Sequence, residues 1–197
     1  QEGDYDLAGF CIGIVERKSI ITGQDISVGD RLIGLASSGP HSNGYSLIRH
    51  IIEDQQLVLD APVIDQLLAP TRIYAKAIQQ TLTTVDIKGM SHITGGGFTE
   101  NLPRMFGSLL AADIDLDSWT RPSVFQWLQQ SGKVDEAEML QTFNCGIGYI
   151  LCVSPEFEAQ AMKALADAGE NPTNIGEIVA KGSNSKEGHL VLDNTGH

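Results

Sequence analysis

Hydrophobic residues along this chain form two kinds of pattern, and the first, a short apolar run, predicts strands. Nearly continuous apolar runs bounded by Gly, Pro, Asn or Ser are typical of buried strands. Such runs predict strands over residues 7–15, 31–37, 85–93, 108–116, 146–154, 174–180 and 189–193. The linker over residues 181–188 is rich in turn-forming residues and predicts a hairpin connection between the last two strands.

The second periodicity places apolar residues three and four apart, as on one face of a helix. It predicts helices over residues 43–52, 71–82, 121–132 and 155–169. Thr71, which follows a proline, is a candidate N-cap for the second of these helices, and Asn43 for the first. In the last helix, Phe157, Ala161 and Leu165 form the apolar stripe, and a glycine closes it.

Strand and helix signals alternate over most of the chain, which predicts an α/β (α+β) fold with one mixed sheet and helices packed on its faces. The chain opens at Gln1 without an initiator Met, and a strand-like run starts almost at once. We therefore expect a fragment whose upstream portion is missing. Residues 1–15 would be the end of a linker, the last strand of a preceding domain or the first strand of this one, and residues 16–197 the domain itself.

Composition narrows the class of protein. The 197 residues are 42% hydrophobic and carry a formal charge of −12, which argues against a nucleic-acid surface because phosphate backbones attract Lys and Arg clusters. No apolar run approaches the roughly 20 residues of a membrane helix, and no signal peptide is visible. The three cysteines show no zinc-site spacing, so we expect reduced thiols in a cytoplasmic protein.

Two glycine-rich loops carry the candidate chemistry. Residues 38–44 (SGPHSNG) and 94–97 (TGGG) each join a predicted strand to a predicted helix. Free N–H groups and the helix dipole favour an anion at such a junction, and glycine lets an oxyanion approach the backbone. Hydroxyl donors are added by Ser37, Ser38, Ser42 and Thr94. Neither loop has the spacing of a P-loop or of GxGxxG, so the loops predict a holder of phosphorylated small molecules, without a standard nucleotide fingerprint.

Structural alternatives exist for these residues. The TGGG segment is also explained by a tight turn, and Glu100 in the first helical turn would repel a nearby phosphate. His41 is also explained as a loop histidine bonded to a carbonyl group. Asn43 is also explained as a helix cap.

Other residues are interpreted as structural. Cys145 is expected to be a small packing residue rather than a nucleophile, because no positive neighbour is evident that would lower its pKa. Trp119 and Trp127 are expected in the core or at an interface. The alternating Asp113, Asp115 and Asp117 resemble a metal cluster, but we expect all three to lie solvated on one strand face.

Five motifs in order carry a family resemblance over essentially the whole chain. They read YDLAGFCIGIVER, GLASSGPHSNGYSLIR, LLAPTRIY, HITGGGFTENLPR and FNCGIGYIL. Together they resemble the C-terminal part of the phosphoribosylformylglycinamidine cyclo-ligases, also called aminoimidazole ribonucleotide synthetases. The resemblance implies a three-layer C-terminal domain, related to the ferredoxin-like fold, of an ATP-using superfamily.

The resemblance also implies a function in purine biosynthesis. In this family ATP phosphorylates the formyl oxygen of formylglycinamidine ribonucleotide, a substrate nitrogen attacks that carbon, and phosphate leaves. ATP and Mg²⁺ would be bound mainly by an N-terminal domain that precedes this chain. The intact enzyme would be a cytoplasmic homodimer. No metal ligand is assigned here. His41 is the candidate catalytic residue. The candidate substrate- or phosphate-binding residues are Ser37, Ser38, Gly39, Ser42, Asn43, Gly44, Arg72, Thr94, Gly95, Gly96, Gly97 and Asn144.

Two other functions remain open on the sequence. The chain would serve as a non-catalytic phosphate-binding or dimerisation module if its loops only hold a partner. It would be a small-molecule kinase if it belongs to another branch of the same superfamily. An upstream segment rich in Asp and Gly would favour the enzyme.

Overall fold

The computed structural model describes residues 9–184 and 188–193 and contains one six-stranded sheet. The spatial order of its strands is β2-β4-β1-β5-β3-β6. In chain order the strands are β1 (Arg31–Ala36), β2 (Ile87–His92), β3 (Leu110–Asp115), β4 (Ile147–Val153), β5 (Pro172–Ala180) and β6 (His189–Asp193).

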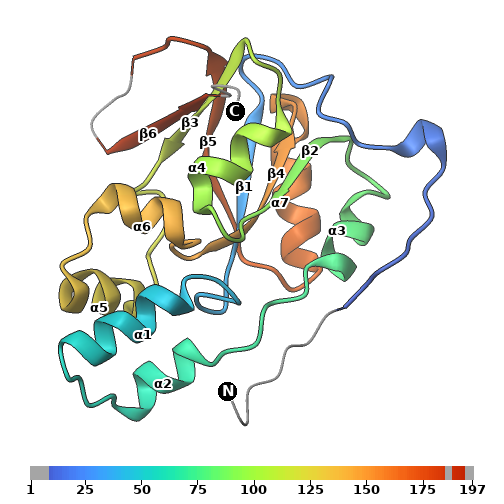
Figure 1. Ribbon diagram of the computed structural model, residues 1–197. Coiled ribbons are helices and arrows are strands. Elements are labelled where there is room, and N and C mark those ends of the chain that lie inside the picture. Colours follow the sequence, from blue (N-terminus) through green and yellow to red (C-terminus); the bar gives the residue numbers. More distant parts are fainter. Residues whose placement is uncertain (1–8, 185–187, 194–197) are drawn as a thin grey trace.

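All five neighbouring strand pairs are antiparallel, where a mixed sheet was expected. The predicted α/β (α+β) class with helices on both faces of one sheet is confirmed (Figure 1). Because β1 and β2 both run antiparallel to β4, they are parallel to each other, and the same reasoning through β5 gives β3 that direction. The loops that follow β1, β2 and β3 therefore lie along one edge of the sheet, the edge formed by the C-terminal ends of these three strands.

Two layers of helices cover the sheet. The helices are α1 (Tyr45–Asp54), α2 (Ala61–Leu67), α3 (Ala75–Thr81), α4 (Gly97–Asn101), α5 (Ser123–Gly132), α6 (Glu136–Thr142) and α7 (Glu158–Asp167), with short 3₁₀ turns at Arg17–Ser19, Leu102–Met105 and Pro155–Phe157. Residues of α3 and α7 pack on one face. Residues of α1, α2, α4, α5 and α6 build the larger core on the other, and α1, α2 and α5 gather beyond the sheet edge in Figure 1. In the part of the chain that is described, none of the helices has the length and apolarity needed to cross a membrane.

The apolar periodicity located most elements correctly, and β6 coincides with its predicted range. Helix α7 begins at Glu158 after a 3₁₀ turn. Helix α5 ends at Gly132, the predicted stop, and its C-cap Lys133 has a left-handed conformation. Two short helices, α2 and α6, were not predicted. Each is capped by an aspartate, Asp60 or Asp135, which accepts a backbone N–H of the first turn.

Four local predictions are wrong. Within the predicted strand over residues 7–15, the described residues 9–15 form no strand, while residues 7 and 8 lie outside the described part. Residues 181–188 do not connect a hairpin, because β3 lies between β5 and β6. Thr71 does not cap α3, which starts after Tyr74, and Asn43 does not cap α1, whose N-cap is Gly44 in a left-handed conformation. For residues 9–15 and 181–188 the prediction fails because a strand needs a neighbouring strand to pair with, and the sequence does not show which strands are neighbours.

Candidate functional site

The loop after β1 is held in place by an asparagine from the other half of the chain. Ser37 donates its hydroxyl to Oδ1 of Asn144 at 2.8 Å, and Nδ2 of Asn144 donates to the carbonyl of Gly39 at 2.9 Å. The amide of Ser37 also donates to the carbonyl of Gly146 at 2.8 Å. These bonds are buried, so they fix the course of the loop over the start of β4.

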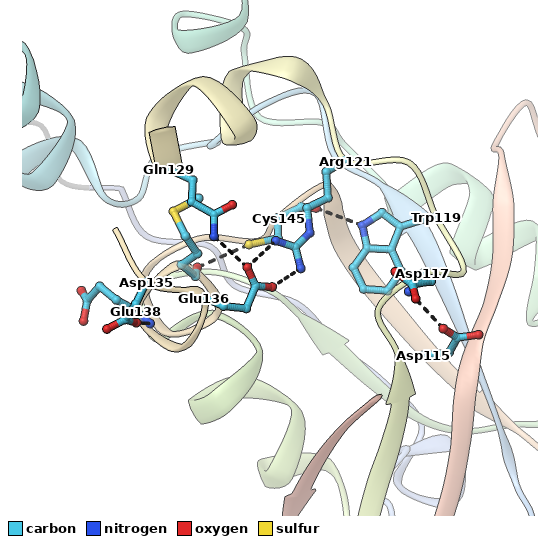
Figure 2. Close-up of polar contacts among 10 residues, drawn as sticks. Asp115, Asp117, Trp119, Arg121, Gln129, Asp135, Glu136, Glu138 and Cys145 are labelled. Atoms are coloured by element: carbon cyan, nitrogen blue, oxygen red, sulfur yellow. Dashed lines mark hydrogen bonds and ion pairs between the residues drawn. The ribbon is translucent and has the colours of Figure 1, made fainter. Parts of the chain in front are cut away.

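A cluster of polar contacts around Cys145, the residue after Asn144, fixes the turn that presents Asn144; Figure 2 shows the side chains of this cluster. Trp119 donates its indole N–H to the carbonyl of Cys145 at 3.0 Å, and the Cys145 thiol lies 3.4 Å from the carbonyl of Met139. Arg121 forms a bidentate pair with Glu136, which ties the loop after β3 to α6 and lowers the pKa of Glu136. Cys145 is fully buried, as expected of a packing residue. Burial raises the pKa of Cys145 to about 12 against the opposing charge of Arg121, a positive neighbour that the sequence did not reveal.

His41 is the most constrained polar residue of the first loop. His41 is only 5% exposed, and its backbone φ is 58°, in the left-handed region. Nε2 faces the backbone N–H groups of Ser38 at 3.3 Å and Arg72 at 3.5 Å, so it is the acceptor and Nδ1 carries the proton of the neutral ring. The alternative that His41 donates to a carbonyl is wrong among the described residues, because Nδ1 has no partner there.

The electrostatics of His41 keep it neutral. Burial, followed by the nearby His92, lowers the pKa of His41 from 6.5 to about 4. At neutral pH the residue therefore presents a single N–H donor and no positive charge. A buried donor without a partner is costly, on the order of 1–3 kcal/mol. Such a group is expected where a ligand completes the hydrogen bond.

Aromatic rings surround His41, and sequence reasoning missed this group. The ring centroids of His41, Tyr74 and His92 lie 6.2–6.3 Å apart, and Tyr149 lies 5.3 Å from Tyr74 and 5.8 Å from His92. The rings converge because Gly148 on β4 leaves room, since a Cβ there would overlap with the Tyr74 hydroxyl. Tyr74 lies in the range predicted as a helix over residues 71–82, and nothing local in the sequence reveals the group.

The loop after β2 is built differently. Nδ2 of Asn101 donates to the carbonyls of Gly97 at 2.8 Å and Gly95 at 3.0 Å, and contacts that of Thr94 at 3.4 Å. Gly96 has φ of 90°. A Cβ at Gly97 would overlap with the backbone carbonyl of Leu140 at the end of α6. The glycines thus serve both the turn and a close backbone approach.

The two loops are neighbours, as the sheet order requires. A Cβ at Gly95 would lie 3.2 Å from Oδ1 of Asn43, so the tip of the second loop touches the first. The structure therefore brings together the candidate residues Ser37, Ser38, Gly39, His41, Ser42, Asn43, Gly44, Thr94, Gly95, Gly96, Gly97 and Asn144.

Arg72 and Asp113 depart from expectation, whereas Asp117 is exposed as expected. The Arg72 guanidinium pairs with Glu170 at 2.9 Å, so only its backbone N–H faces His41. Asp113 is not solvated, because its side chain is 6% exposed and lies 2.8 Å from Nδ1 of His189 on β6. Asp115 accepts the backbone N–H of Asp117. Among the described residues, no group of three or more His, Cys, Asp or Glu side chains is placed to hold a metal ion.

Comparison with known proteins places the chain in a family. A family model described as "AIR synthase related protein, C-terminal domain" matches residues 27–188. A phosphoribosylformylglycinamidine cyclo-ligase of Nitrosococcus oceani is 49% identical over 100% of this chain and 56% of its own length. A protein of the same name from Chromobacterium violaceum is 51% identical over 89% of this chain and 53% of its own length.

The chain thus spans about half the length of the curated relatives it matches. The match runs through both glycine loops and the Asn144 turn, which are the elements that meet at the sheet edge. The chain belongs to the AIR synthase related protein family, and its matched residues form the C-terminal domain of that family.

Proposed function

We propose that this chain is the C-terminal part of an ATP-dependent cyclo-ligase that converts formylglycinamidine ribonucleotide to aminoimidazole ribonucleotide in purine biosynthesis. The observation that carries the proposal is the identity of about half of all positions with two relatives named phosphoribosylformylglycinamidine cyclo-ligase, across both loops. The enzyme would be a cytoplasmic homodimer acting on a small molecule.

Both loops would line the ligand site, each with different groups. The first loop offers side chains, among them the His41 N–H donor and the Ser42 hydroxyl. The second loop has no ionisable side chain in its TGGG segment, so its backbone amides would be the groups that meet an oxyanion. Preorganised donors of this kind stabilise charge that develops on oxygen during the reaction.

The role proposed for His41 follows from its protonation. With a pKa of about 4, it is neutral at physiological pH and is suited to donate a hydrogen bond rather than to supply positive charge. The backbone amides of Ser38 and Arg72 fix its tautomer through Nε2. ATP, when bound, supplies the phosphoryl group that activates the formyl oxygen. The described residues fit no Mg²⁺ cluster, so we assign no metal ligand to them.

The exposed apolar side chains among the first described residues favour the presence of a neighbouring domain. Phe10, Ile12 and Ile14 are 97%, 95% and 102% exposed, and they alternate with Gly and Cys residues along a segment that forms no helix or strand. Exposed apolar side chains at period two are typical of a strand that pairs elsewhere. We infer that residues 9–15 add to the sheet of a preceding domain, which would also contribute most of the ATP site.

The experiment compares the 197-residue chain with a full-length version that carries the N-terminal half of the Nitrosococcus oceani cyclo-ligase, in a coupled assay of ADP release with substrate and Mg²⁺. We expect turnover from the full-length protein and none from the chain alone. In the full-length protein, His41→Gln should reduce kcat/KM by roughly tenfold or more, the scale of one lost donor in an active site. His50→Gln, on the exposed side of α1, serves as the control. Equal turnover of the chain and the full-length protein would refute the proposal that a preceding domain contributes most of the ATP site.

A further inference from the structure

The segment over residues 70–72, between α2 and α3, contacts the first loop at three points and belongs to no helix or strand. The contacts are Ser38 Oγ to the carbonyl of Pro70 at 2.6 Å, Ser42 Oγ to Thr71 Oγ1 at 3.3 Å, and the backbone N–H of Arg72 to Nε2 of His41 at 3.5 Å. Because no helix or strand bonds hold this segment, its position against the first loop depends on side-chain contacts.

Arg72 connects this segment to the loop that follows α7. Nη2 of Arg72 lies 2.9 Å from Oε2 of Glu170 and 3.4 Å from the carbonyl of Gly169. The Glu170 side chain is 7% exposed, whereas the glutamates of the other ion pairs between described residues are 32–44% exposed. A carboxylate this buried is costly unless it is paired, so it needs the Arg72 guanidinium beside it. The pair therefore constrains where Arg72 lies.

The end of α7 fixes the backbone that carries Glu170. The N–H of Gly169 donates to the carbonyl of Ala166, and the N–H of Glu170 donates to that of Leu165, each at 3.0 Å. Gly169 has φ of 89°, in the left-handed region. The two bonds and the left-handed glycine form a Schellman motif. Because Leu165 is fully buried in the core on this face of the sheet, the motif ties Glu170 to a well-packed part of the fold.

The other end of this connection is the ring of His41. Nε2 of His41 faces two backbone N–H groups, that of Ser38 at 3.3 Å and that of Arg72 at 3.5 Å, and both distances are long for a hydrogen bond. Nδ1 has no partner among the described residues, so within that part of the chain only these two contacts select the tautomer. If segment 70–72 moved away, a single long bond would remain.

We propose that Glu170 acts through Arg72 as a positioning residue for His41. The buried ion pair holds segment 70–72 against the first loop, and the backbone N–H of Arg72 then keeps the His41 proton on Nδ1. Arg72 thereby has a supporting role in place of the phosphate contact expected from the sequence, because its guanidinium is paired with Glu170. The effect on turnover rests on the proposed function, whereas the tautomer of His41 is measurable on the chain alone.

The test determines the tautomer from long-range proton–nitrogen correlation spectra of the histidine rings in the 197-residue chain at neutral pH, with His41→Gln to assign the signal. We expect wild type to show the tautomer with the proton on Nδ1. Glu170→Gln keeps the shape of the side chain and removes its charge, so we expect a mixture of both tautomers and shifted backbone amide signals in residues 70–72. Arg72→Gln should have the same effect. The double variant should add nothing, because the two residues act as one pair.

Glu177→Gln is the matched control, because Glu177 pairs with Arg31 at the end of β1 opposite to the first loop. It should leave the His41 tautomer unchanged. Thermal melts show which variants are folded. If Glu170→Gln does not fold, Arg72→Gln, at the more exposed partner, decides in its place. An unchanged tautomer in the folded variant, or a wild type with the proton on Nε2, would overturn the proposal.

Turnover provides the second measurement. In the full-length enzyme, Glu170→Gln should lower kcat by roughly threefold to tenfold, the scale of one hydrogen bond, and leave KM nearly unchanged because no ligand contact is removed. If the full-length protein shows no cyclo-ligase activity, the proposed function fails, and the tautomer measurement still decides the role of Glu170. The two proposals therefore fail separately.

Discussion

The two glycine-rich loops share one local pattern and are built by different means. Each follows a strand, turns on glycine and opens a helix at the same edge of the sheet. In the loop after β2, Asn101 caps carbonyls only four to seven residues away. In the loop after β1, Asn144 reaches back across more than 100 residues to Ser37 and Gly39.

The difference teaches that a glycine-rich junction does not by itself reveal a binding loop. The second loop satisfies its carbonyls locally and packs Gly97 against the backbone of α6. The first loop carries His41, a buried donor without a partner among the described residues, beside an open cavity. A buried polar group without a partner among the described residues thus distinguishes the first loop, while the glycines of the second loop are required first by packing.

The largest expected effect is on the packing of the second loop. Gly97→Ala places a Cβ against the Leu140 carbonyl in a residue with φ of 54°, so neither backbone can yield without breaking α4 or α6. We expect a loss of about 4 kcal/mol or more in the free energy of unfolding, measured by urea denaturation. Gly107→Ala is the control, since a Cβ there has open space. A loss below about 1 kcal/mol would show that the approach to α6 is not tight.

The next effect separates local from long-range support. Asn144→Ala removes three buried hydrogen bonds, to Ser37, Gly39 and Gly146, and should destabilise the fold by about 3 kcal/mol. Hydrogen exchange should rise throughout residues 37–44. Asn101→Ala should instead raise exchange in residues 94–97 and leave the first loop protected. If Asn144→Ala leaves the first loop protected, the long-range support is dispensable.

A third prediction concerns pH, since the first loop contains a buried histidine and the TGGG segment contains no titratable group. The folded pKa of His41 is about 4 against an ordinary value of 6.5, so between these values the unfolded chain binds a proton that the native chain does not. Stability is therefore intact above pH 6.5 and falls as the pH drops toward 4. The free energy of unfolding should fall by about 2 kcal/mol or more over this pH range because of His41 alone.

Denaturant titrations from pH 7 to pH 4 measure this slope. His41→Gln should flatten it by up to one proton, whereas His50→Gln, an exposed substitution on α1, should retain it. Parallel slopes for wild type and His41→Gln would mean that His41 takes up its proton in the folded state as readily as in the unfolded one.

The smallest effect decides whether the second loop also binds. A Cβ at Gly96 meets the flexible side chain of Glu100, and φ is 90°, so Gly96→Ala should cost about 1 kcal/mol or slightly more in stability. If backbone amides of this loop hold a phosphate, calorimetric titration of the full-length enzyme should show weaker binding of ATP or substrate beyond that loss. Unchanged affinities in a folded Gly96→Ala enzyme would reduce the second loop to a turn.

Most elements of the fold were predictable because their signals are local. Apolar runs located β1 through β6, and helical spacing located α1, α3, α5 and α7. The aspartates before α2 and α6 were visible in the sequence, but these seven-residue helices bury only one and two residues and show no clear apolar stripe. The equally short α3 buries three. The strand predicted over residues 7–15 failed because apolar alternation shows that a strand is possible but does not supply its partner.

The candidate site divides in the same way. Glycine and hydroxyl residues at strand ends are local signals, so the sequence alone located both loops. The ordered motifs indicated the family, and His41 and Asn144 became candidates through that resemblance. Only the tertiary structure brought Tyr74, His92 and Tyr149 around His41, buried Asp113 against His189, and paired Arg72 with Glu170. These contacts join residues far apart in the chain. Strand order and direction decide which ends meet at an edge, and the residues at those ends do not encode that choice locally.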